Sequence, residues 1–201
     1  MFVRNPRKLI LNALILLLAT LLTSCNVTKY VPDGSYLLNK VKISTDHKDI
    51  KSSELVRYLR QTPNPKLFDA INFNVALYSL SSPDTALWIN RFLRKIGDEP
   101  VIYDSILTVA SQRELKKYLN NKGFTDANVT ANVSYKKKKA SVHYKVQCGE
   151  PYMIQNLTYR VRDPEIRNII LKDTVNATIR KGDRFDIEQM GKLSRKSLIS
   201  A

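Results

Sequence analysis

The chain has 201 residues, with 33 lysines and arginines against 18 aspartates and glutamates, so its formal net charge is +15. A hydrophobic content of 43% excludes a wholly disordered chain, and the length allows one domain or two small ones. Two cysteines exclude a disulfide-rich scaffold, and two histidines leave little for a metal cluster. The charge indicates an acidic partner, which could be nucleic acid, anionic lipid or lipopolysaccharide.

Residues 1–24 have the pattern of an export signal. A positively charged stretch precedes an apolar run of 14 positions from Leu9 to Leu22, which is short for a membrane-spanning helix. The run ends in LTSC, which resembles a bacterial lipobox, so we expect cleavage before Cys25 and a lipid on its thiol. An ordinary signal peptide with an incidental cysteine and an uncleaved anchor are the alternatives. Cleavage would lower the net charge to +12.

The mature chain is expected to begin with a tether over residues 25–35, which ends in a Pro-Asp-Gly turn. Apolar residues that alternate with lysines predict a strand over 36–43. Apolar residues at helical spacing predict a helix over 51–61, with Asp49 or Ser52 as its cap.

Residues 62–110 are less regular and form an insertion between the clearer elements. The apolar stretch 68–80 is expected to contain a helix, and residues 85–96 have helical spacing that ends at Gly97. Residues 100–104 have the character of extended chain.

The clearest helical pattern covers residues 111–122. Ser111 and Glu114 match a capping box, and Gly123 stands where a helix-ending glycine is expected. The sequence therefore predicts that this helix starts at Ser111.

Two runs of alternating residues predict a β-hairpin. Residues 127–135 alternate apolar with polar, and the phase reverses over 140–147. A turn between them pairs Tyr135 with Ala140 and places every apolar side chain on one face. Because a lone hairpin is marginally stable, we expect helices to cover that face.

The turn of this hairpin consists of Lys136, Lys137, Lys138 and Lys139. A solvent-exposed tip whose charge deters edge-to-edge aggregation explains them, and contact with anionic lipid or lipopolysaccharide is the alternative. The later Cys148 is expected to be a small half-buried residue and not a nucleophile, since no partnered histidine is evident.

The order strand, helix, insertion, helix, strand, strand over residues 36–149 resembles a POTRA domain with a helical insertion. The motifs TKYVPDGSYLLNKVKI, EPVIYDSILT, YLNNKGF and GEPYMI, in this order after the lipobox, are similar to the Bacteroidota lipoprotein branch of BamA/TamA-type outer-membrane assembly factors, usually called TamL. The expected fold class is therefore α+β, with a POTRA-like β-α-α-β-β unit.

Residues 150–201 resemble the beginning of a second POTRA unit. A first strand is expected near 154–161, a short helix capped by Asp163 follows, and Asp186 caps a second helix. The strand pair of this second unit and the C-terminal barrel of the relatives do not appear in the sequence. We therefore expect a truncated chain whose second unit is incomplete and less stable than the first.

The resemblance implies a lipid-anchored protein of the outer membrane whose POTRA region faces the periplasm. It further implies binding of unfolded outer-membrane protein clients, and a TamB-like periplasmic partner, through β-augmentation. The edge-strand candidates are Asn128, Thr130, Asn132 and Ser134. The competing expectation for this edge is that residues 62–110 cover it.

No catalytic residue, metal site or cofactor is expected, and the chain is not expected to be an enzyme. Export disfavours a nucleic-acid partner, and no basic-aromatic recognition motif is present. The alternative function is a free-standing outer-membrane lipoprotein that binds anionic glycolipid or a partner protein.

Overall fold

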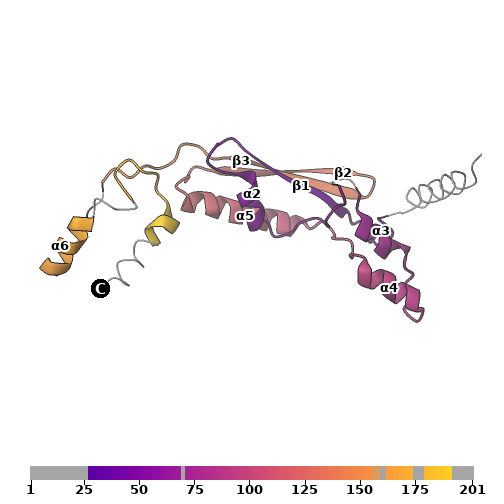
Figure 1. Cartoon of the computed structure of the whole chain (residues 1–201). Helices are drawn as coiled ribbons and strands as arrows, with labels where there is room; N and C mark the ends of the chain where they lie inside the picture. Colours follow the sequence, from indigo (N-terminus) through magenta and orange to yellow (C-terminus); the bar gives the residue numbers. More distant parts are fainter. Residues whose placement is uncertain (1–26, 69–70, 157, 159–161, 174–178, 192–201) are drawn as a thin grey trace, which may run out of the picture. The chain divides into compact units, whose positions relative to one another are not determined.

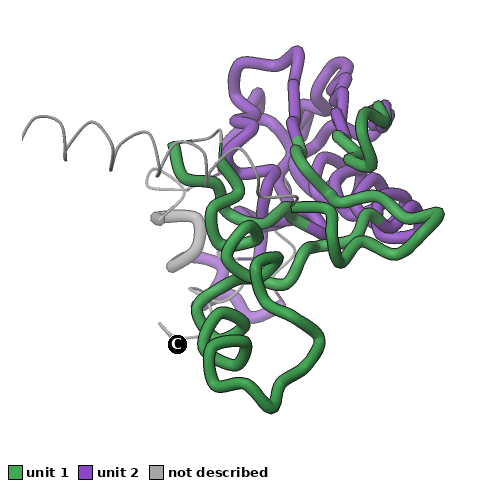
Figure 2. The backbone as a smooth tube through the Cα atoms, turned by 90° about the vertical axis from the view of Figure 1, so that its right-hand side faces the viewer, with its two compact units in different colours: residues 1–41, 62–103, 133–141 green, residues 42–61, 104–132, 142–201 purple. Residues whose placement is uncertain are grey.

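The computed structural model describes residues 27–68, 71–156, 158, 162–173 and 179–191 (Figure 1). The predicted signal peptide and Cys25 lie outside these residues. The chain divides into two compact units (Figure 2). Unit 1 consists of residues 1–41, 62–103 and 133–141, and unit 2 consists of residues 42–61, 104–132 and 142–201.

The fold is α+β and contains a three-stranded sheet in the order β1-β3-β2. Its strands are β1 (Leu37–Thr45), β2 (Asn128–Lys136) and β3 (Lys139–Gln147). The N–H of Leu37 donates to the Lys138 carbonyl, and the N–H of Asp46 donates to the Val146 carbonyl. The residue numbers of the bonded groups rise together along β1 and β3, so the two strands are parallel.

The predicted hairpin is confirmed. Strands β2 and β3 flank a two-residue loop in which Lys137 and Lys138 have φ angles of 47° and 60°. Two left-handed residues define the tight turn whose twist suits a hairpin. The resulting register places Tyr135 opposite Ala140, as the two alternations predict.

The helices are α2 (Ser52–Leu55), α3 (Phe73–Leu80), α4 (Trp88–Ile96), α5 (Ser105–Asn121) and α6 (Pro164–Asp173), with a 3₁₀ turn η1 (Val56–Tyr58) after α2. Helix α3 confirms the helix expected within residues 68–80. Helix α4 confirms the one expected over 85–96, and Gly97 ends it as predicted.

The predicted start of α5 is wrong. Asp104 caps the helix, because its carboxylate accepts the N–H groups of Ile106 and Leu107 at 2.7 and 3.4 Å. Ser111 lies inside the helix, where its hydroxyl donates to the Leu107 carbonyl at 2.7 Å. Ile106 is 76% exposed. The first turn therefore lacks the buried stripe from which periodicity locates a helix.

The helix predicted over 51–61 is also wrong in length and capping. Residues 52–55 form one α-helical turn, η1 continues it to Tyr58, and the residue before the helix, Lys51, makes no side-chain cap bond. The Asp49 carboxylate lies 3.5 Å from the Arg184 guanidinium. A long-range ion pair thus replaces the local cap that the sequence suggested.

The core of unit 2 lies between α5 and the part of the sheet that belongs to this unit (Figure 1). Several side chains from α2, from α5 and the residues after it, and from β3 and the residue after it are at most 2% exposed and form this core. They are Leu55, Leu115, Leu119, Phe124, Val142, Tyr144, Val146 and Cys148. Helices α5 and α2 contribute to this core and cover the apolar face of the hairpin in this unit. This agrees with the expectation that a hairpin alone is only marginally stable.

In unit 1, the segment that precedes α5 pairs with the beginning of β1. The Leu38 N–H donates to the Val101 carbonyl at 2.7 Å, and the Tyr103 N–H donates to the Tyr36 carbonyl at 2.8 Å. The extended character expected for residues 100–104 is therefore explained by this short antiparallel pairing.

The predicted caps of the second POTRA-like segment are confirmed. Asp163 accepts the N–H groups of Glu165 and Ile166, and Asp186 accepts those of Glu188 and Gln189. Of the strand expected near 154–161, residues 157 and 159–161 lie outside the described part of the chain. In the parts that the structure describes, no helix has the length and apolar character needed to cross a membrane.

Candidate functional site

Strand β2 lies at an edge of the sheet. Its neighbour is β3, and no other strand of the described residues pairs with it. Residues 101–103 of the insertion pair with β1, and among the described residues no backbone pairing joins the insertion to β2. Whether side chains of the insertion cover the β2 edge stays a prediction. An uncovered edge presents backbone donors and acceptors to another extended chain.

The hairpin register determines which backbone groups of β2 face this edge. A two-residue loop makes Lys136 and Lys139 a hydrogen-bonded pair, after which bonded and non-bonded pairs alternate. The N–H and C=O groups of Ala131, Val133 and Tyr135 therefore point away from β3.

A side chain of α5 occupies one end of the edge. Gln112 donates from its Nε2 to the Val129 carbonyl at 2.9 Å. This bond fits the register, in which the Val129 carbonyl faces outward. The accessible edge therefore begins after Val129 and extends toward the hairpin turn.

The predicted edge-strand residues are exposed. Asn128, Thr130, Asn132 and Ser134 project from the polar face of β2, and the Ser134 hydroxyl contacts the Ser141 carbonyl at 3.5 Å. Their own backbone groups point toward β3. The edge-facing backbone groups belong to the alternate residues, which the sequence analysis missed, although the turn position combined with the alternation rule could have identified them.

Burial decreases along β2 toward the turn. Val129 is 8% exposed, whereas Tyr135 is 52% exposed. The Tyr135 ring lies 4.5 Å from the Tyr36 ring and 6.0 Å from the Tyr103 ring, measured between centroids. These three tyrosines form an aromatic surface beside the open end of the edge, where the apolar or aromatic side chains of an added strand could pack.

The lysines of the turn are not one uniform cationic patch. Lys136 and Lys137 are exposed, whereas Lys138 and Lys139 are half-buried. The Lys138 ammonium lies 3.1 Å from the Asp33 carboxylate. Part of the positive charge at the tip is therefore neutralised within the chain.

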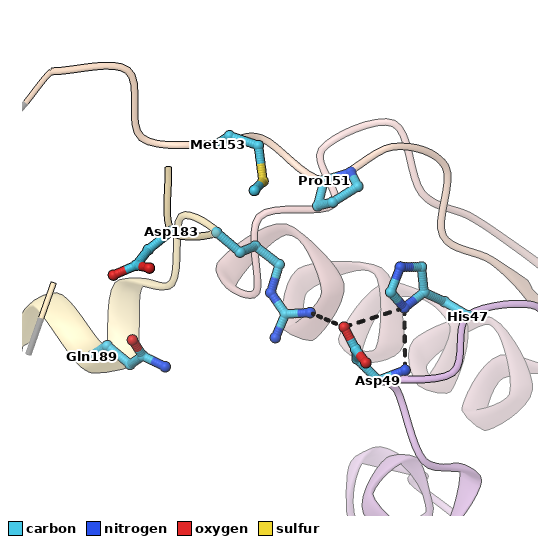
Figure 3. A pocket seen from close by; sticks show the side chains of 7 residues that line it. His47, Asp49, Pro151, Met153, Asp183 and Gln189 are labelled. Carbon is cyan, nitrogen blue, oxygen red and sulfur yellow. Dashed lines mark hydrogen bonds and ion pairs between the residues drawn. The ribbon is translucent and has the colours of Figure 1, made fainter. Parts of the chain in front are cut away.

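Unit 2 contains a pocket of about 430 Å³ (Figure 3). His47 and Asp49 line one side, and the Asp49 carboxylate pairs with Arg184 on the other. The Arg184 guanidinium also stacks over the Phe124 ring at 5.2 Å. Because its charge is already paired, this arginine offers little net attraction to an anionic ligand.

A nucleophile or metal centre finds no support in these contacts. Cys148 is fully buried and lies 3.6 Å from the Thr45 hydroxyl, and burial raises the pKa of its thiol. His143 lies on the polar face of β3, 2.9 Å from the Ser44 hydroxyl. No group of three potential metal ligands occurs among the residues that the structure places.

The second segment is fixed to the end of α5 in unit 2. The Tyr152 N–H donates to the Gly123 carbonyl, and the Phe185 N–H donates to the Tyr152 carbonyl, both at 2.8 Å. The Lys122 ammonium lies 2.9 Å from the Asp186 carboxylate, which is buried. Burial opposes ionisation of Asp186, but Lys122 outweighs it and holds the pKa of this carboxyl below its usual value.

Comparison with known proteins places the chain in a family. A solved structure of BamA POTRA domains 3–5 from Haemophilus influenzae is similar with a TM-score of 0.30 and 12% identity, covering 85% of this chain and 88% of that chain. No curated protein matches the chain. The family model described as POTRA, surface antigen variable number repeat, matches residues 36–149, which are more than half of the sequence. Because this match covers more than half of the chain, the chain belongs to the POTRA family.

Proposed function

We propose that this chain is the periplasm-facing, lipid-anchored POTRA region of a BamA/TamA-type factor that assembles or translocates outer-membrane proteins, of the lipoprotein branch called TamL. The edge position of β2, with which no further strand of the described residues pairs, supports the proposal. An unfolded client or a partner strand adds to this edge and extends the sheet by β-augmentation.

The edge is suited to weak binding of many different client sequences. An added strand bonds to the outward backbone groups of Ala131, Val133 and Tyr135, and each such bond contributes about 0.5–1.5 kcal/mol net. Backbone pairing depends little on the client's sequence. The exposed tyrosines Tyr36 and Tyr135 add a preference for apolar or aromatic side chains in the client.

Lipid attachment at Cys25 would hold the domain at the outer membrane. A multiply acylated cysteine anchors stably, whereas a single chain is marginal. In this setting the clients are unfolded outer-membrane proteins, and a TamB-like periplasmic protein is a candidate partner.

Site-specific photo-cross-linking to a peptide of alternating apolar and polar residues tests the edge. A cross-linker at Asn132 on β2 should label the peptide, and one at Lys117, which is exposed on α5, serves as the matched control. Labelling from Lys117 with none from Asn132 would contradict β-augmentation at β2.

The alternative is a free-standing outer-membrane lipoprotein that binds anionic glycolipid or a partner protein. The exposed Lys136 and Lys137 favour it. Binding to lipopolysaccharide that weakens steeply with added salt, and that is lost in a Lys136→Ser/Lys137→Ser variant, would support this alternative.

A further inference from the structure

Helix α4 exposes its apolar side to solvent. Trp88 is 69% exposed, Phe92 is 50% exposed, and Ile89 and Ile96 are 40% and 41% exposed. In a helix of 3.6 residues per turn these four side chains share one face, called here the α4 apolar face. A helix at the surface of a globular domain normally turns such a face toward the core, so α4 has the inverted orientation.

Polar contacts fix this orientation. Asn90, on the opposite side of α4, is only 5% exposed. Its side chain donates to the Asp84 carbonyl at 2.6 Å and accepts the Ser82 N–H at 3.0 Å. The Arg94 guanidinium donates to the Ser81 hydroxyl and the Ser82 carbonyl. The helix cannot rotate to bury its apolar face without breaking this network.

The end of α4 is equally constrained. A Cβ atom at Gly97 would lie 2.5 Å from the backbone nitrogen of Tyr78 and 2.8 Å from the Asn74 carbonyl oxygen, so the chain passes directly over α3. Asn74 also donates to the Asp98 carboxylate at 3.0 Å. The exposed apolar face is therefore a built feature of unit 1, and its hydration costs free energy until something covers it.

The charges of α4 indicate what covers this face. The helix carries Arg91, Arg94 and Lys95 and no acidic residue. At 100° per residue Lys95 and Arg91 flank the apolar face on the side of Trp88, whereas Arg94 lies opposite it. Tryptophan, phenylalanine and isoleucine on one face with cationic residues at its border are typical of helices that lie in the interface of an anionic membrane. Arg91 and Lys95 are exposed and can reach lipid phosphates.

The tether holds the same part of unit 1 near the predicted anchor. The Lys29 ammonium donates to the carbonyls of Ser79 and Ser81 at 3.0 and 2.8 Å, and the Tyr30 hydroxyl also donates to Ser81. Lys29 is four residues after Cys25. Four residues span at most about 14 Å, so a lipid on Cys25, which belongs to the proposed function, would keep this end of α3 close to the bilayer.

We infer that the α4 apolar face is a membrane-docking surface, which inserts into the headgroup region of an anionic bilayer. Trp88 and Phe92 enter the interface, and Arg91 and Lys95 bind lipid phosphates. Docking orients the POTRA domain on the membrane, whereas the acyl chains on Cys25 only tether it.

Trp88 is the only tryptophan of the chain, so its fluorescence reports on α4 alone. The experiment uses the full mature lipoprotein with vesicles of phosphatidylethanolamine and phosphatidylglycerol. We expect the Trp88 emission to shift to shorter wavelength, and brominated lipids to quench it. A Phe92→Ser/Ile96→Ser variant should reduce the inserted-to-exposed ratio at least about tenfold, because burial of each such side chain is worth more than that factor.

The matched control is Ile106→Ser, which removes an equally large exposed side chain from α5 and should leave the Trp88 signal unchanged. Circular dichroism verifies that each variant is folded. Flotation of the chain with vesicles while Trp88 stays exposed to iodide overturns the inference and leaves the lipid anchor standing. Failure to float, with Trp88 exposed, overturns both. Shielding of Trp88 that rises with protein concentration in the absence of lipid assigns the face to self-association and also overturns the inference.

Discussion

Two proline substitutions at neighbouring residues of β2 separate the free edge from the hairpin ladder. The register directs the Val133 N–H away from β3 and the Asn132 N–H toward the His143 carbonyl. Val133→Pro therefore removes an edge donor and leaves the ladder intact, whereas Asn132→Pro removes a ladder bond. Proline is tolerated in strands where its missing N–H would face away from the neighbour.

The expected magnitudes follow from burial and pairing. Asn132→Pro leaves the half-buried His143 carbonyl without its donor, which costs about 1–3 kcal/mol. Val133 is half-buried, and proline keeps the same number of side-chain carbons, so the change in packing should cost less than about 1 kcal/mol. We expect Asn132→Pro to be the more destabilising of the two by at least about 1 kcal/mol.

Urea unfolding monitored by circular dichroism measures the two free energies, and the cross-linking peptide measures binding. Val133→Pro should stay folded and lose the peptide. Equal destabilisation by both substitutions would refute the register, and full peptide binding by Val133→Pro would refute the edge as the site.

Three further predictions concern unit 2. Burial raises the pKa of Asp186, but Lys122, which follows α5, and the backbone N–H groups of Glu188 and Gln189 outweigh it and hold this pKa below its usual 3.8. The stability that the ionised carboxylate contributes is therefore complete above pH 3.8 and is lost as the pH falls further, and Asp186→Asn should abolish this acid dependence in urea titrations. Gly123→Ala should lower the free energy of unfolding by more than about 1–2 kcal/mol, because its φ is +88° and the new Cβ would clash with the Phe185 carbonyl. Gly182→Ala is the control: its φ is +90° but the space around it is open, so it should cost only the strain of the left-handed backbone. Burial raises the pKa of Tyr118 from 10.0 to about 12, so the stability it contributes is complete below pH 10 and is lost as the pH approaches 12. The pKa of Tyr135 is also raised, so an absorbance titration should show a late phase that loses the amplitude of one tyrosine in Tyr118→Phe.

Local patterns predicted the elements whose own sequence carries the signal. The two alternations flanking the lysine turn determined the hairpin and its register, because a shift by one residue would turn every apolar side chain outward. Asp163 and Asp186 were predictable as caps, since the capped N–H groups are two and three residues away. Gly97 ends α4 as predicted, but its φ of −89° is not that of a left-handed cap, and the close approach to α3 leaves no room for a Cβ there.

Elements that depend on distant partners were not predictable. Ser111 and Glu114 imitate a capping box, but Arg60 donates its N–H to the Ser111 hydroxyl and pairs with Glu114. Asp49 was expected to cap a helix, yet it pairs with Arg184, which lies 135 positions away. In each case a long-range contact uses the side chain that the local pattern assigned to a cap.

The sequence by itself determined that this chain has an α+β POTRA unit with an alternating hairpin. Only the tertiary structure decided which edge is open, because residues 101–103 could have paired with either outer strand and they pair with β1. It also decided that α4 faces its apolar side outward, since periodicity gives a helix two faces but not the direction of either. That direction is set by the Asn90 hydrogen bonds, which hold the polar side against the protein and leave Trp88 and Phe92 exposed.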